Sequence, residues 1–283
     1  MPLVFVPTPL GNLRDVTLRA LDVLRDCELL VAEDSRVARR LLSALQLPGK
    51  EIWTYHDHNA AGATRGILER ARLGLVAVVT DAGMPGISDP GGELVAAARE
   101  GGVDVEVLPG PSAAVSVLVL SGFNARRWCF EGFPPRSAGE RRRVFSAAIA
   151  RGIPSVWYES PQRIIDTLAD IDAVAPDARL FLLREYTKRF EQQLLGTASD
   201  VGAKLDVPVR GEIAFVIDAA DEPAQTVAPD ATALEARIDN MLAEQLAVSA
   251  IAKALADEGY GERRHIYARV TERKRVQRES TRS

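Results

Sequence analysis

Two short segments of the sequence bring together side chains that could handle a proton or an anion. Glu33-Asp34-Ser35-Arg36 follows the apolar run at residues 29–32 and combines two carboxylates with a guanidinium. A carboxylate can accept a proton from a reacting hydroxyl, and a guanidinium binds phosphate. Asp34 or Ser35 could equally cap the next helix, so the chemical and structural interpretations carry equal weight. Asp81, which ends a second apolar run, is a further candidate proton acceptor.

The segment from Asp81 to Gly92 holds four glycines and two prolines in twelve positions. Glycine permits close approach of the backbone to a ligand, and proline stiffens a loop. A connection this long between a strand and a helix is more often functional than structural. It has neither the GxGxxG pattern of dinucleotide-binding folds nor the GxxxxGK[ST] pattern of phosphate-binding loops. We therefore expect a ligand-binding loop of another kind.

Three segments mix cations with aromatic side chains or concentrate basic residues, which suits phosphate contact and base stacking. They are 184–191, which contains Arg184 and Lys188, 130–143, which contains Arg136, and the basic C-terminal stretch. A solvated charged surface is an alternative of similar weight for each segment. Together the three segments favour a polyanionic partner.

His56-Asp57-His58 places two of the three histidines of the chain close together. A metal site would need a third ligand, and no matching His or Cys group stands out. We therefore predict no metal, and we expect His56 and His58 in a polar loop near the ligand cleft.

The elements that must position these residues alternate along the chain. Apolar runs at 3–6, 29–32, 75–80 and 103–108 predict strands, and amphipathic stretches at 17–25, 37–45 and 93–100 predict helices. This order predicts an α/β domain with a mainly parallel sheet, whose ligand crevice lies at the carboxyl ends of the strands. The segments Thr8–Asn12, Glu33–Arg36, Asp81–Gly92 and Pro109–Ala113 all follow such strands, so we expect them to converge there.

A second α/β segment follows, with expected strands at 127–130, 155–158, 179–183 and 213–217 and helices at 138–150 and 161–170. Residues 218–230 are rich in Ala, Pro and Asp, as linkers are. Helical stretches at 233–245, 248–258 and 262–273 predict a small, helix-turn-helix-like unit. We therefore divide the chain into domains 1–120 and 121–220, a linker at 221–232 and a basic helical unit at 233–283.

Charge is distributed unevenly along the 283 residues. The formal net charge is −4, but residues 261–283 carry +5, which leaves −9 on the rest. An acidic body with a basic end is typical of proteins that hold a nucleic acid at one edge. Two cysteines without a CxxC pair argue against a disulfide scaffold or zinc ribbon. No signal peptide and no membrane span is expected, which favours the cytoplasm.

Several motifs, in this order, resemble one known family. They are VPTPLGNLRDVTLRAL, LVAEDSR, VVTDAGMPGISDPG, LPGPSA, FEGFPPR, YESPQRI, LLREYTKRFEQ and RGEIAFVI. The chain is similar to bacterial 16S rRNA (cytidine-2′-O)-methyltransferases of the tetrapyrrole-methylase superfamily, densely over residues 3–218 and more weakly through AIAKALADEGYGERRHIYARV. The superfamily's usual GGDP is here Ala82-Gly83-Met84-Pro85, without the acidic residue, as in its RNA-methylating members.

The resemblance implies two α/β domains of the tetrapyrrole-methylase type (class III methyltransferase), with S-adenosylmethionine in the cleft between them, and a homodimer. By motif position the cofactor residues would be Pro9, Asp81, Ala82, Gly83, Met84, Pro85, Gly86, Ile87, Ser112, Ala113 and Tyr158. Candidate bases for a ribose hydroxyl are Glu33, Asp34 and Asp81. Candidate contacts to 16S rRNA in the small ribosomal subunit are Arg36, His56, His58, Arg136, Arg184 and Lys188.

Two other functions remain open at this point. A small-molecule, tetrapyrrole-type methylase is disfavoured by the absent GGDP motif and by the basic terminal helix, which a porphyrin would not require. A non-catalytic rRNA-binding assembly protein with a degenerate cofactor pocket would differ by failing to bind the cofactor.

Overall fold

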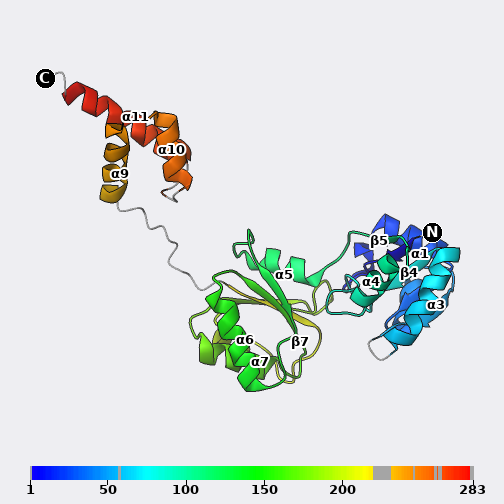
Figure 1. The fold of residues 1–283 in the computed structure, drawn as a ribbon. Coiled ribbons are helices and arrows are strands. Elements are labelled where there is room, and N and C mark those ends of the chain that lie inside the picture. The colour runs from blue at the N-terminus through cyan, green and yellow to red at the C-terminus, as the bar shows by residue number, and fades with distance from the viewer. Residues whose placement is uncertain are drawn as a thin grey trace. The chain divides into compact units, whose positions relative to one another are not determined.

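In a computed structural model the chain divides into two compact units, residues 1–220 and 221–283 (Figure 1). The structure describes residues 2–56, 59–218, 231–244, 246–257, 260 and 263–280. His58 and residues 221–230 of the predicted linker lie outside the described residues. The domain boundary expected near residue 120 within the first unit remains a prediction.

The N-terminal part of the first unit is built on a parallel sheet of five strands in the order β3-β2-β4-β1-β5. Its strands are β1 (Leu3–Phe5), β2 (Leu29–Ala32), β3 (Glu51–Thr54), β4 (Val76–Val79) and β5 (Val105–Val107). Its helices are η1 (Leu13–Asp15), α1 (Leu18–Asp26), α2 (Ser35–Ala44), α3 (Ala60–Leu73) and α4 (Gly92–Glu100).

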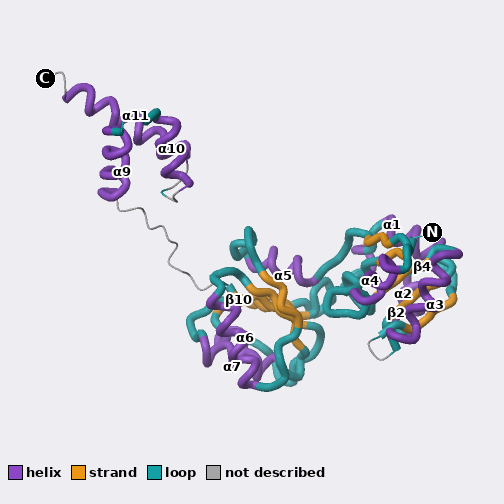
Figure 2. Tube along the Cα trace, viewed as in Figure 1, coloured by secondary structure: helices purple, strands orange, loops and turns teal. Residues whose placement is uncertain are grey.

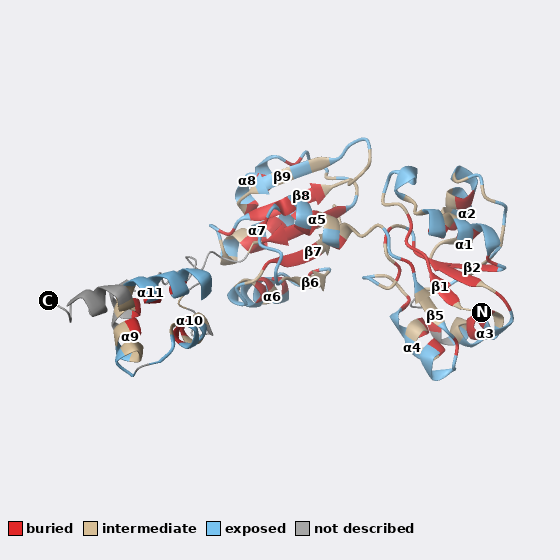
Figure 3. Ribbon diagram, turned by 90° about the horizontal axis from the view of Figure 1, so that it is seen from above, coloured by how far each residue is buried: buried red, intermediate tan, exposed pale blue. Residues whose placement is uncertain are grey.

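Successive side chains of the central strands point to opposite faces of this sheet, and both faces are buried, as is usual for a parallel sheet. Leu3 and Phe5 pack with α3 and α4 on one face, whereas Val4 and Val6 pack with α1 and α2 on the other. Figure 3 shows these strands as a buried layer between more exposed helices. With helices on both faces, the carboxyl edge of the sheet is left to the connecting loops.

The second sheet is mixed, with the order β6-β7-β10-β8-β9 (Figure 2). Only β6 and β7 run parallel, and the other neighbouring pairs are antiparallel. Its strands are β6 (Cys129–Gly132), β7 (Ser155–Glu159), β8 (Leu180–Arg184), β9 (Gln192–Gly196) and β10 (Ile213–Ile217). The helices around it are α5 (Ala113–Ser121), α6 (Ala138–Ala150), α7 (Ile164–Val174) and α8 (Ala198–Ala203).

The same alternation fixes the faces of the second sheet. Ile213, Phe215 and Ile217 of β10 pack with α6, α7 and α8, whereas Ala214 and Val216 pack under α5. Helix α5 therefore starts at the segment Pro109–Ala113, which follows β5, and its buried side packs in the core of the second sheet. The two sheets are thus connected directly at the predicted ligand edge.

The second unit consists of α9 (Ala231–Ala243), α10 (Val248–Asp257) and α11 (Arg263–Ser280). Leu234 and Ile238 of α9, Ile251 of α10, and Ile266 and Val270 of α11 form its own apolar core. Three helices around one core confirm the helical unit expected from the sequence. The turn between α10 and α11 is described only at Tyr260.

Most predicted elements occur within one to four residues of their expected bounds. Elements that the apolar pattern did not reveal are η1, β3, α3, α5, β9 and α8. Strand β3 reads EIWT and is half exposed at the sheet edge, so it lacks the apolar run of a buried strand. Within the described part of the chain, no helix is both long and apolar enough to cross a membrane.

Candidate active site

Three of the loops predicted to converge meet in the structure. Thr8, after β1, and Gly83, after β4, form an isolated antiparallel bridge, with both backbone N–H···O bonds at 2.9–3.0 Å. Gly110, after β5, packs so closely that a β-carbon there would lie 2.8 Å from Cβ of Pro7. The glycines therefore allow the backbones of neighbouring loops to approach one another at the carboxyl edge.

The loop after β4 requires glycine for its shape. Gly83 and Gly86 both have φ of +84°, a conformation that L side chains rarely adopt. This shape turns the segment from Asp81 to Ile87 toward the second sheet. Its side chains and backbone then form one wall of a pocket.

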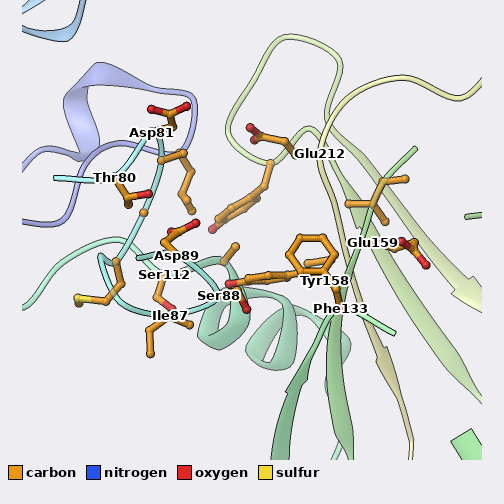
Figure 4. A pocket seen from close by; sticks show the side chains of 18 of the residues that line it. Thr80, Asp81, Ile87, Ser88, Asp89, Ser112, Phe133, Tyr158, Glu159 and Glu212 are labelled. Carbon is orange, nitrogen blue, oxygen red and sulfur yellow. The ribbon is translucent and has the colours of Figure 1, made fainter. Parts of the chain in front are cut away.

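The pocket has a volume of about 380 Å³ and is lined by both halves of the first unit. From the N-terminal half come Leu10, Glu33, Thr80, Asp81, Ala82, Gly83, Met84, Ile87, Ser88, Asp89, Ser112 and Ala113. From the second half come Phe133, Tyr158, Glu159, Ser160, Pro161, Leu183, Tyr186, Gly211, Glu212, Ile213 and Ala214. Figure 4 shows Thr80 and Asp81 on one side of it and Glu212, Phe133 and Tyr158 on the other, with Asp89 between them.

Carboxylates dominate the polar lining of this pocket. Glu33 accepts a hydrogen bond from Thr80 Oγ1 at 3.0 Å. Burial raises the pKa of Asp81, and the negative charge of Glu33 adds to the effect. Burial also raises the pKa of Asp89 to about 6, partly opposed by a hydrogen bond from Thr80 and reinforced by neighbouring carboxylates. A carboxyl with such a pKa changes its protonation state near neutral pH, as a general base must.

Tyr158 ties the second sheet to the start of α5. Its hydroxyl oxygen accepts a hydrogen bond from the backbone N–H of Ala114 at 3.1 Å, and burial raises its pKa to about 12. Its ring packs edge-on against Phe130 and Phe133, with ring centroids 5.0 and 5.7 Å away. Phe133 remains 54% exposed at the rim of the pocket. This leaves an aromatic surface available to a ligand.

The buried Arg141 and the half-buried Arg163 hold the rim beside Phe133. Arg163 donates to the carbonyl oxygens of Pro134 and Pro135 at 2.7 and 3.0 Å, and its guanidinium lies 3.2 Å from the buried carboxylate of Glu159. Arg141 donates to the carbonyl oxygen of Arg136 at 3.1 Å. The rim is therefore fixed through its backbone, independently of the identity of its side chains.

Most of the predicted cofactor residues lie in the pocket. The residues that line it are Asp81, Ala82, Gly83, Met84, Ile87, Ser112, Ala113 and Tyr158. Pro9, Pro85 and Gly86 do not line it, although Leu10 beside Pro9 does. Their predicted contact with a cofactor stays a prediction.

The candidate bases differ in their surroundings. Glu33 and Asp81 line the pocket, and Asp34 does not. Asp34 caps α2 by accepting from Arg36 N at 2.7 Å, and its carboxylate also accepts from the Arg36 guanidinium at 2.7–3.2 Å. These bonds hold the pKa of Asp34 well below its usual range. The helix-cap interpretation accounts for Asp34, which leaves it a weak proton acceptor.

Of the predicted substrate contacts, the five that the structure describes do not line the pocket. Arg36 borders a shallow hollow with Arg39 and Arg40 on α2. Arg136 is exposed. The backbone N–H of His56 donates to Asn59 Oδ1 at 2.9 Å, at the beginning of α3.

Two further predicted contacts are engaged within the protein. Arg184 donates to Gln192 Oε1 and to the carbonyl oxygen of Arg210. Lys188 Nζ lies 2.9 Å from carboxylate oxygens of both Glu185 and Glu212. A phosphate would have to compete with these partners.

Sequence reasoning missed several residues that line the pocket, namely Thr80, Asp89, Phe133, Tyr186 and Glu212. Asp89 lies inside the glycine-rich loop already singled out, in the run Ser88-Asp89-Pro90, so attention to every acid of that loop could have found it. Tyr186 lies just after strand β8, and Glu212 lies just before strand β10. No local sequence motif marks either residue.

One half of the first unit has a parallel sheet, the other half has a mixed sheet, and the pocket lies between them. This arrangement defines a class of protein, and solved structures share the fold. A crystal structure of diphthine synthase superposes with a TM-score of 0.61 at 16% identity, covering 77% of this chain and 90% of that one. Uroporphyrin-III C-methyl transferase from Thermus thermophilus, solved with S-adenyl homocysteine, gives a TM-score of 0.54 at 18% identity, covering 77% and 97%.

Residues 2–202 match the family described as Tetrapyrrole (Corrin/Porphyrin) Methylases, and the chain belongs to this family. It is 40% identical to ribosomal RNA small subunit methyltransferase I of Neisseria meningitidis serogroup B, over 76% of this chain and 75% of the relative. The protein of the same name from Micromonospora olivasterospora is 37% identical over 95% of this chain and 86% of its own length. The fold class and family expected from the motifs are thereby confirmed.

Proposed function

We propose that this protein transfers a methyl group from S-adenosylmethionine to the 2′-hydroxyl of a cytidine ribose in the 16S rRNA of the small ribosomal subunit. The observation that carries this proposal is the similarity, along most of the chain, to proteins named ribosomal RNA small subunit methyltransferase I. The cytidine 2′-hydroxyl rests on the motif resemblance, and the electrostatics of the pocket support the cofactor.

The pocket is suited to a cationic cofactor. Its volume of about 380 Å³ lies in the range of small-molecule sites. Its lining includes the carboxylates Glu33, Asp81, Asp89 and Glu212, and none of its described lining residues is Lys, Arg or His. S-adenosylmethionine carries a sulfonium and an ammonium group, which negative side chains stabilise. The backbone of the loop at Gly83, which tolerates close approach, would hold the rest of the ligand.

The negative charge of the pocket also discriminates between the two candidate substrates, a porphyrin and RNA. A porphyrin polycarboxylate would meet like charges in this pocket, at a considerable electrostatic cost. A ribose hydroxyl and a cytosine ring are neutral, whereas the phosphates beside them could stay outside, near Arg36, Arg39 and Arg40. RNA therefore fits the pocket and its surroundings better than a tetrapyrrole does.

Within the pocket, Asp89 accepts the proton of the reacting 2′-hydroxyl. When bound, S-adenosylmethionine supplies an electrophilic methyl group, which leaves its sulfur as a bond to the ribose oxygen forms. The single hydroxyl proton of Thr80 is within reach of both acids: it is donated to Glu33 at 3.0 Å, and a hydrogen bond from the same group to Asp89 would lower the pKa of that carboxyl. The exposed ring of Phe133 provides a stacking surface for the cytosine. Glu33 and Asp81 remain alternative bases.

The decisive experiment is methyl transfer from labelled S-adenosylmethionine to small ribosomal subunits that lack the modification. Free rRNA and uroporphyrin III serve as parallel substrates. We expect label in a cytidine ribose of 16S rRNA. Label only in the porphyrin would support the tetrapyrrole alternative, and cofactor binding without any transfer, or no binding at all, would overturn the proposed activity.

We further propose a homodimer in the cytoplasm, where such a substrate is found. Helix α5 supports the dimer, because Val115, Val119 and Leu120 remain 50%, 70% and 37% exposed on a helix with few polar residues. A second copy would cover this apolar face. Light scattering should give twice the chain mass, and Val119→Asp should reduce it to one chain.

A further inference from the structure

The Lys and Arg residues of α11 whose side chains the structure describes fall into two sets that differ in their partners. Arg269 and Arg273 are paired with acidic residues of α9. Arg269 Nη2 lies 3.3 Å from Glu235 Oε1, and Arg273 donates to both carboxylate oxygens of Asp239 at 2.8 and 2.5 Å. These pairs join the first and last helices of the unit, so this set has a structural role.

The second set consists of Arg263, Arg264 and Lys274. Within the residues that the structure describes, none of the three takes part in an ion pair or a side-chain hydrogen bond. Arg263 and Arg264 are exposed, and Lys274 is half exposed. Their charges are therefore left for a partner outside the unit.

Helical geometry places the second set on one side of α11. At about 100° per residue, Arg263, Lys274, Tyr267, Thr271 and Arg264 fall within an arc of about 100°. Ile266 and Val270, which point into the core, and the paired arginines lie outside this arc. Its described members include no acidic residue. We call these five residues the α11 basic face.

An aromatic ring lies among the cations of this face. Tyr267 is 48% exposed although it follows directly after the buried Ile266. Thr271 Oγ1 donates to the carbonyl oxygen of Tyr267 at 2.8 Å, so its hydroxyl does not bind the phenol. Unpaired cations interleaved with an exposed aromatic side chain are typical of surfaces that contact phosphates and stack on bases. A merely solvated face would need no aromatic residue.

We propose that the α11 basic face binds RNA, with Arg263, Arg264 and Lys274 on phosphates and Tyr267 against an unpaired base or its ribose. This assignment rests on the proposed function, because it takes rRNA as the partner. The three positive charges complement the polyanion, whereas the pocket of the first unit is acidic. The basic excess of the C-terminal segment is thus divided between helix packing and RNA contact.

The test uses the full chain and a labelled 16S rRNA transcript. The triple variant Arg263→Ala, Arg264→Ala and Lys274→Ala should weaken binding by at least tenfold, and it should lower the slope of log K against log salt by about 2. Tyr267→Ala should weaken binding about tenfold with little change in that slope. Calorimetric affinity for S-adenosylmethionine should stay unchanged in both variants.

A charge-matched control comes from the same unit. Lys253 of α10 is exposed, so Lys253→Glu changes the charge as Arg264→Glu does. We expect Arg264→Glu to weaken rRNA binding far more than Lys253→Glu. Equal effects, or an unchanged salt slope in the triple variant, would overturn the assignment. Competition by duplex DNA as effective as that by rRNA would also overturn the choice of RNA.

The methylation assay separates this assignment from the proposed activity. If the unmodified chain fails to methylate small subunits, the proposed function fails, whatever the binding data show. If it methylates them and the triple variant keeps the same KM for rRNA, the α11 basic face is not an RNA contact. The expected result is a raised KM with unchanged kcat. Circular dichroism melting of each variant checks that the helical unit still folds.

Discussion

Replacing Asp89 by asparagine removes the proposed proton acceptor while keeping nearly the same shape. Asp89 lines the pocket between the first sheet and the second, and burial is the main cause that raises its pKa to about 6. The charges of Glu33, Asp81 and Glu212 raise the pKa further. Asparagine cannot accept the proton, so the variant tests the function of the carboxylate separately from the packing of the loop.

The magnitude follows from the pKa. With a pKa of about 6, roughly one tenth of the Asp89 carboxyl is ionised at pH 5 and about nine tenths at pH 7. The ionised form is the active base, so kcat/KM should rise about tenfold between these pH values and level off above pH 7. Asp89→Asn should lose about a hundredfold to ten-thousandfold in kcat, together with the rise around pH 6.

The assay is single-turnover methyl transfer at saturating labelled S-adenosylmethionine, between pH 5 and pH 8. Asp81→Asn, in the same loop, is the matched control and should keep the rise, moved to a lower pH because one neighbouring negative charge that raises the pKa of Asp89 is gone. Full turnover by Asp89→Asn at every pH would refute the reasoning. Normal turnover combined with weakened cofactor binding would instead make Asp89 a cofactor ligand.

Three further outcomes are expected. Asp89→Asn should raise the melting temperature above pH 7 but not below pH 4, because a raised carboxyl pKa in the folded state gives stability that is lost as the pH rises through about 6. Arg141→Met should lower the free energy of unfolding by about 1.5–3 kcal/mol in denaturant titrations, because the buried carboxylate of Asp170 loses its buried partner and keeps only Arg142. Gly110→Ala should weaken cofactor binding in calorimetry, because its β-carbon would press on Pro7, whereas Gly49→Ala, with nothing within 4 Å, should not.

The convergence of the loops could be predicted from the sequence because it follows from chain order alone. Parallel strands place all their carboxyl ends at one edge, so the segments after β1, β4 and β5 had to meet. The bridge between Thr8 and Gly83 agrees with that expectation. The half of the pocket that comes from the second sheet could not be predicted in this way. Glu212 and Tyr186 reach it through antiparallel pairing of distant strands, which has no local signal.

The chemical roles were harder to predict, because they depend on partners. Asp34 and Asp89 are both acids near the ends of strands, yet Asp34 is bound to Arg36 and Asp89 is buried in the pocket. Lys188 likewise counted as a free cation in the sequence, but two carboxylates surround it. Ion pairing and burial determine whether an acid or a base is available for chemistry, and a sequence motif shows neither of them.

The arginine bonds behind the pocket rim have a thermodynamic consequence. Arg163 and Arg141 hold the carbonyl oxygens of residues 134–136, so the backbone beside Phe133 is already ordered in the free protein. The conformational entropy of this segment is lost when the chain folds, and little remains to be lost when a nucleotide arrives. Because the backbone of this rim is already ordered, the binding free energy of a base stacked on Phe133 would not be reduced by the entropy cost of ordering the rim.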